Sequence, residues 1–125
     1  MLTTHGPRNV WWGHMPGEGQ VEHPIVSIER KNKSDIHAIH GKGTDPRTLR
    51  GYSKNFVIVE PHEVPPASSY NKPLTKRTYF IIRINIPIPT ENLRSYIGLM
   101  VWHKFREIKQ KWLRLIEGDY ETRGG

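Results

Sequence analysis

Two pairs of residues are of the types that take part in metal binding or acid–base chemistry, and the members of each pair are close in sequence. His37 and His40 are three residues apart, which would place both side chains on one face of a helix, and His62 is followed directly by Glu63. A zinc site needs three or four ligands, and neither pair has a further Glu or a Cys at ligand spacing. We therefore predict no metal site and no cofactor. A small hydrolase or metal enzyme is a third hypothesis, which ranks below the two given at the end of this section.

The sequence has no pattern typical of nucleophilic catalysis. It lacks a Gly-x-Ser-x-Gly elbow, and no Ser or Thr has a recognisable base partner. The absence of Cys excludes disulfides, thiolate metal sites and thiol catalysis. The run from Gly41 to Thr44 superficially resembles a phosphate loop, but Lys42 is followed by Gly43 where that loop needs Ser or Thr. We predict no catalytic residue and a chain that is not an enzyme.

Positive charge is the most informative functional feature. The chain has 19 Lys and Arg against 12 Asp and Glu, a net charge of +7, and such an excess is typical of nucleic-acid-binding proteins. Much of it falls in the Gly-rich segment 29–54, where mobile basic loops would suit a phosphate backbone. A solvated basic face is the alternative interpretation. The predicted RNA phosphate contacts are Arg30, Lys31, Lys33, Lys42, Arg47, Arg50, Lys54, Lys76 and Arg77.

Residues 1–24 predict an irregular arm, because Gly and Pro are too dense there for helical or strand periodicity. This arm carries Trp11 and Trp12, whose large rings must pack either on the domain or on a partner. Met1–Val10 has no apolar core of a secretory signal and too few Arg for a transit peptide. The predicted partner-packing residues are Trp11, Trp12, Trp102 and Trp112.

The remaining chain, 25–125, predicts one small domain with a sheet over about 25–88. Strand-like runs occur at Ile25–Ile28, at Asn55–Val59 and at Thr78–Ile86, where apolar residues alternate. Pro87 and Pro89 then end the last strand. We expect a mostly antiparallel sheet of short strands, linked by Gly- and Pro-rich loops.

A long C-terminal helix is predicted from about 91 to 117. Thr90 suits the N-cap, Glu91 suits the first turn, and Gly118 suits a stop after the last one. Leu93, Tyr96 and later apolar residues follow a helical stripe. The longest uncharged apolar run, 96–102, is far shorter than the ~20 residues that span a bilayer.

Together these features predict an α+β fold with a small antiparallel sheet, a long terminal helix and an irregular N-terminal arm. Hydrophobic residues make up only 35% of the chain, which suggests that part of its apolar surface is covered by a partner. The combination of arm, sheet and helix resembles accessory proteins of ribosomes, especially organellar ones. That resemblance implies a non-enzymatic structural subunit bound to ribosomal RNA, with the mitochondrial matrix as the expected location.

The alternative hypothesis is a peripheral accessory subunit of a mitochondrial respiratory complex or another membrane complex. Such a subunit would bind neighbouring proteins through the Trp arm and the terminal helix, and its charge would serve acidic partners or anionic lipid head groups. Both hypotheses place the chain in a large multi-subunit assembly.

Overall fold

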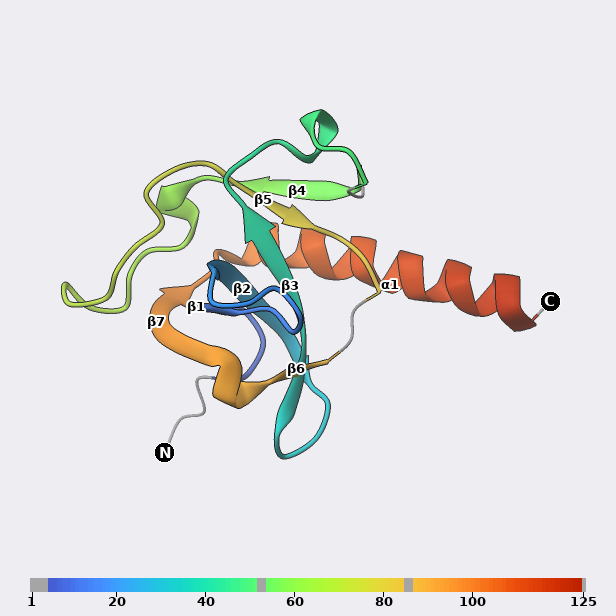
Figure 1. Ribbon diagram of the computed structural model, residues 1–125, viewed down its shortest axis with the longest axis horizontal. Coiled ribbons are helices and arrows are strands. Elements are labelled where there is room, and N and C mark those ends of the chain that lie inside the picture. Colours follow the sequence, from blue (N-terminus) through green and yellow to red (C-terminus); the bar gives the residue numbers. More distant parts are fainter. Residues whose placement is uncertain (1–4, 52–53, 85–86, 125) are drawn as a thin grey trace.

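The computed structural model describes residues 5–51, 54–84 and 87–124 of the chain. Over these residues, seven strands and three short 3₁₀ helices precede one long α-helix at the C-terminus (Figure 1). The elements are β1 (Asn9–His14), β2 (Glu22–Arg30), β3 (Asp35–Lys42), η1 (Pro46–Thr48), β4 (Phe56–Val59), η2 (Pro61–Glu63), β5 (Thr78–Ile81), β6 (Ile88–Pro89), η3 (Thr90–Asn92), β7 (Leu93–Leu99) and α1 (Trp102–Gly124).

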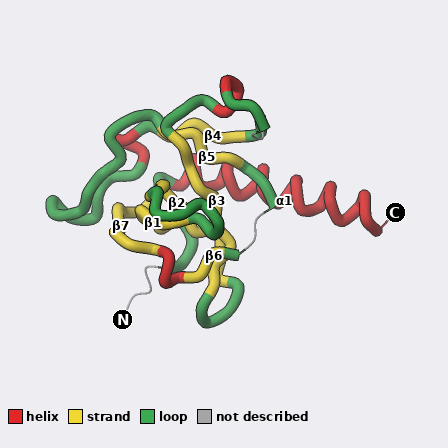
Figure 2. The backbone as a smooth tube through the Cα atoms, in the orientation of Figure 1, coloured by secondary structure: helices red, strands yellow, loops and turns green. Residues whose placement is uncertain are grey.

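The strands form one antiparallel sheet in the order β4-β5-β3-β2-β1-β7 (Figure 2). Strand β3 has two partners on its outer side: β6 pairs with its first residues and β5 with its last. The prediction of an α+β fold with an antiparallel sheet and a C-terminal helix is confirmed.

The larger hydrophobic core lies between the sheet and the first turns of α1. Phe105, Ile108 and Trp112 come from one face of the helix and are at most 4% exposed. They pack with strand residues such as Val26 and Phe80, both fully buried. The later turns of α1 extend past the sheet (Figure 1).

A second, smaller core lies on the opposite face of β1–β3. Because side chains alternate along a strand, Ile25 faces this core while Val26 faces the first one. Ile88 and Leu93 close it from the other side, where β6, η3 and β7 cross from the outer edge of β3 to the outer edge of β1. The sheet therefore has a packed core on each face.

The predicted irregular arm over 1–24 is wrong for Asn9–His14, which forms an interior strand of the sheet. β1 pairs with β2 on one side, as in Val10↔Val26, and with β7 on the other, as in Asn9↔Leu99. Part of the Gly and Pro that indicated an arm lies beyond its end, in a turn where Gly17 and Gly19 have positive φ, while Gly13 lies within the strand.

The predicted helix start at Glu91 is also wrong, because Leu93–Leu99 is β7 and α1 begins at Trp102. The apolar stripe that suggested a helix buries Leu93 and Ile97 within a strand. Pairing with β1 stabilises the extended backbone more than local helical periodicity stabilises a helix. The helix also continues through Gly118 to Gly124, beyond the predicted stop. None of the described helices is long and apolar enough to cross a membrane.

Replacing Gly98 with Ala tests the closeness of β7 to the loop that follows η2. A Cβ at Gly98 would overlap the carbonyl oxygen of Pro65, and it would lie 3.1 Å from the Ala67 nitrogen. We expect G98A to lower the free energy of unfolding by about 1–3 kcal/mol in urea denaturation. The matched control is G118A, where a Cβ meets nothing within 4 Å in the helix and should stabilise by up to about 1 kcal/mol. Equal effects of the two substitutions would contradict the packing described here.

Candidate functional site

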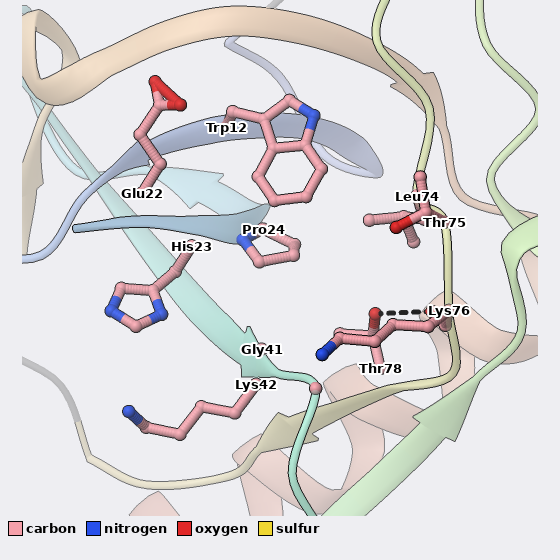
Figure 3. A pocket seen from close by; sticks show the side chains of 11 residues that line it. Trp12, Glu22, His23, Pro24, Gly41, Lys42, Leu74, Thr75, Lys76 and Thr78 are labelled. Carbon is pink, nitrogen blue, oxygen red and sulfur yellow. Dashed lines mark hydrogen bonds between the residues drawn. The ribbon is translucent and has the colours of Figure 1, made fainter.

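A pocket of about 210 Å³ lies at the end of the β2–β3 hairpin that is remote from its turn (Figure 3). Strands β1, β2 and β3 contribute to it, together with the segment that leads into β5. Its lining residues are Trp12, Glu22, His23, Pro24, Gly41, Lys42, Gly43, Leu74, Thr75, Lys76 and Thr78.

Strand register places three of the polar groups next to one another. Ile25 pairs with His40, and side chains two residues apart along a strand share a face. His23 and Lys42 therefore follow Ile25 and His40 on the same face of the sheet. This placement explains why the rings of His23 and His40 meet, with their centroids 5.3 Å apart and nearly perpendicular.

Two lysines give the pocket its positive charge. Lys42 ends β3, and Lys76 lies in the segment before β5. Both residues line the pocket, but the Lys42 side chain lies with His23 on one side of β3, and the Lys76 side chain lies with Trp12 and Pro24 on the other (Figure 3). The Lys76 side chain lies directly over Gly43, where any Cβ would overlap its Cε. Thr78 donates its hydroxyl to the Lys76 carbonyl at 3.2 Å and so fixes the backbone there.

Trp12 forms an aromatic wall of the same pocket and is held in place. Its indole N–H donates to the Lys72 carbonyl at 2.9 Å, and the Lys72 ammonium lies 5.0 Å from the ring centroid. Pro24, which pairs with Trp12 across β1 and β2, adds a second flat apolar surface. A pocket lined by an aromatic ring and two lysines suits a ligand that carries both a ring and a phosphate.

His23 is the titratable group at the end of this pocket. It is 9% exposed, and its Nε2 lies 3.9 Å from Glu18 Oε2. Burial lowers the pKa of His23 below its ordinary value, and the positive charge of Lys42 lowers it further, against the opposing effect of Glu18. At neutral pH the imidazole is therefore neutral and able to accept a proton.

His40 lies behind His23 and is only 1% exposed. Within the described part of the chain, neither of its ring nitrogens has a hydrogen-bond partner. Burial, followed by the charges of Arg83, His23 and Lys42, lowers the pKa of His40 to about 3. His40 therefore stays neutral at every pH at which the protein is expected to work.

The nine predicted phosphate contacts do not form one surface. They divide into three groups, placed at the β2–β3 turn, in the β3–β4 loop and around the pocket. Arg30, Lys31 and Lys33 belong to the first group, Arg47, Arg50 and Lys54 to the second, and Lys42 and Lys76 to the third; Arg77 follows Lys76 in the chain but is not among the residues that line the pocket.

Other parts of the chain already bind Arg30, Arg47, Lys54 and Arg77. Arg30 donates to the carbonyls of Asn32 and Lys33 in the turn. Lys54 donates to two carbonyls of the β3–β4 loop, both at 2.7 Å. The other two are paired with acids: Arg47 with Asp45 at 2.7 Å and Arg77 with Glu60 at 2.9 Å. They hold loops in shape, which makes them poorer candidates for phosphate than Lys31, Lys33, Arg50 and Lys76.

The four tryptophans predicted to pack on partners lie in different surroundings. Trp11 is half-buried against the smaller core and the ring of Tyr96, and Trp12 lines the pocket. Trp112 is 4% exposed, so the chain's own core, and not a partner, covers it. Trp102 is 56% exposed, with the Arg8 guanidinium stacked 3.9 Å above its ring.

Sequence reasoning missed His23 and Glu18 and treated Trp12 only as an anchor. The signal that could have found them is the pair His23-Pro24 at the start of a strongly apolar strand, where a histidine is unusual. Of the residues considered for metal binding, His40 lies next to His23, whereas His37 contacts the Trp112 ring and Glu63 is paired with His103 at 3.2 Å. No group of three potential metal ligands exists among the described residues.

Comparisons with protein-family models, with curated proteins and with solved structures found no match to this chain. The chemistry of the pocket is therefore the basis for a function. Lys42 and Lys76 can hold an anion, His23 can exchange a proton, and Trp12 can stack on a ring.

The buried neutral His40 predicts a loss of stability in acid. The unfolded chain binds a proton at this histidine below about pH 6.5, whereas the folded chain binds it only near pH 3. The free energy of unfolding should therefore fall by about 1.4 kcal/mol per pH unit as pH drops through this range. Urea titrations from pH 7 to pH 4 would measure this slope. His40→Leu should flatten it, and an equal slope in both proteins would contradict the assignment.

Proposed function

We propose that this chain is a non-enzymatic RNA-binding subunit of a larger assembly, and that its pocket holds an RNA phosphate. The observation that carries this proposal is that Lys42, Lys76 and Trp12 all line one pocket. Two ammonium groups supply the charge that a phosphate needs, and the indole supplies a surface for a base.

The geometry favours the pocket over an isolated charged surface. Pro24 and Leu74 add apolar walls to the pocket, where Lys42 is half-buried and Lys76 is exposed. Gly43 leaves room for the Lys76 side chain. A phosphate entering here would displace counterions and would meet charge that is already positioned.

The β2–β3 turn supplies a second contact for the same RNA. Asn32 Oδ1 accepts hydrogen bonds from the Ser34 and Asp35 amides, both at 2.9 Å, so the turn is well defined and carries Lys31 and Lys33 on its exposed surface. The turn and the pocket lie at opposite ends of β2, roughly 25 Å apart at ~3.3 Å per residue. An RNA segment of several nucleotides would reach both.

The ribosome is the assembly that we propose for this subunit, and a membrane-associated protein complex is the alternative. The exposed Trp102 and the end of α1 that extends past the sheet suit protein neighbours in either assembly. Sedimentation of the native chain before and after nuclease treatment separates the two, since only binding to a ribonucleoprotein depends on intact RNA.

Charge removal at the pocket tests the RNA proposal directly. We expect the double variant K42Q/K76Q to weaken binding of a fluorescein-labelled single-stranded RNA and to reduce the slope of log affinity against log salt by about 0.7 per lost phosphate contact. Fluorescence anisotropy over a salt series measures both quantities. K31Q/K33Q should reduce affinity by a smaller amount.

The matched control is K109Q on α1, a helix that contributes no residue to the pocket. It removes a positive charge without touching the site, so binding should stay close to that of the unchanged protein. Failure of the unchanged protein to bind at low salt, or an equal loss in K109Q and K42Q/K76Q, would contradict the proposal.

A second candidate function is cleavage of the bound RNA, and the Glu18–His23 pair is the observation that favours it. A neutral His23 could take the proton of a ribose 2′-hydroxyl, whose oxygen would then attack the adjacent phosphorus. The bond to the 5′ oxygen would break as Lys42 donates a proton to that oxygen. The products would be a cyclic phosphate and a free hydroxyl.

Incubation with labelled RNA in the presence of a chelator tests this second function. Cleavage is expected to leave cyclic-phosphate ends, to increase as pH rises through the titration of His23, and to fall at least a hundredfold in H23A. H37A is the control, since His37 contacts Trp112 away from the pocket. Intact RNA after long incubation would leave binding as the function.

A further inference from the structure

Three buried polar atoms without a hydrogen-bond partner gather around one side chain of the pocket. Within the described residues they are Glu18 Oε2 and both ring nitrogens of His40, and the side chain between them is His23. Buried polar groups are nearly always paired, because an unpaired one loses its hydration without compensation. Their concentration next to the proposed phosphate site connects them to that site.

A histidine at position 40 lowers the stability of the fold, because its surroundings are apolar. Its neighbours on β3 are the apolar residues Ile36, Ala38 and Ile39, all fully buried, and an aliphatic side chain would fill the same space without orphaned nitrogens. The T-shaped contact with His23 is the one ring contact that the structure records for His40. The property that distinguishes His40 from a leucine is therefore the contact that its imidazole ring makes with the ring of His23.

We propose that His40 is a positioning residue of the pocket, which holds the ring of His23 beside Glu18 so that His23 takes up a proton when a phosphate binds. This inference rests on the proposed function. In the free protein Glu18 and His23 are 3.9 Å apart, too far for a hydrogen bond. A protonated His23 would close that gap and would add a positive charge to those of Lys42 and Lys76.

A neutral imidazole is suited to this role in a way that an aliphatic side chain is not. It has one nitrogen that accepts and one that donates a hydrogen bond, so it can adapt to either protonation state of its neighbour. Because His40 stays neutral, it does not repel the proton that arrives on His23. The titratable groups that face His23 from the surrounding elements are His14, Glu18, His40 and Lys42, with Glu22 and Lys76 also lining the pocket.

Phosphate binding and protonation of His23 are then linked. Each favours the other, so RNA affinity should be highest at acidic pH and should decrease as pH rises through the titration of His23 in the complex. A hydrogen bond with the Gly41 backbone also holds His23, so without His40 the ring keeps that contact but loses the packing that fixes its orientation, and this link weakens. A purely structural role for His40 would change stability but would leave the pH profile of binding unaltered.

The test compares the unchanged chain with H40L, H40Q and the control H37L. Anisotropy of a fluorescein-labelled single-stranded RNA is measured from pH 5.5 to pH 8, alongside the thermal midpoint and the NMR titration of the His23 ring. In H40L we expect a raised thermal midpoint, about tenfold weaker binding at pH 6, and a flattened pH profile. H40Q keeps polar atoms at this position and should recover part of the binding, and H37L should bind as the unchanged chain does.

Wild-type affinity and an unaltered pH profile in H40L would overturn the inference. Failure of the unchanged chain to bind RNA at any pH would instead overturn the proposed function. In that case the NMR titration still tests the positioning, because an identical His23 titration in the unchanged chain and in H40L would exclude it. Should H40L not fold, H40Q provides the same comparison.

Discussion

The crossing from β6 to β7 is the constraint on which the rest of the structure depends. β6 pairs with the outer side of β3 and β7 with the outer side of β1, so four strand spacings, about 19 Å in a flat sheet, separate them. The three residues of η3 cover only about 6 Å as a 3₁₀ helix. The sheet must therefore curl around the smaller core, and Ile88 and Leu93 are brought against Ile25 as a result.

The pocket is a consequence of this arrangement. With β7 on one side and β2 on the other, β1 lies inside the sheet, and Trp12 is held at the end of β2 and β3 where His23 and Lys42 emerge. The segment before β5 completes the wall with Lys76. Four elements distant in sequence thus contribute one side chain each, and the charges that they carry lie closer together than the chain order suggests.

The fold class could be predicted from local sequence patterns. The predictions were wrong where contacts between residues distant in sequence determine the secondary structure. The strand at Thr78–Ile81 and the helix α1 could be predicted because in each of them the apolar side chains lie on one side only. Asn9–His14 was not, because its strand exists only through pairing on both edges. Charge indicated Lys42 and Lys76. His23 was missed because strand register brings His40 next to it and the β1–β2 turn brings Glu18, and neither contact follows from a sequence motif.

The measurement that tests the central claim most directly is an NMR chemical-shift titration of the isotope-labelled chain with a short single-stranded RNA. The account predicts that the largest shifts fall on the indole N–H of Trp12, the ring of His23, and Lys42 and Lys76, with smaller shifts at the β2–β3 turn. Shifts spread evenly over the basic residues of the β3–β4 loop and α1, with none at Trp12 or His23, would contradict it.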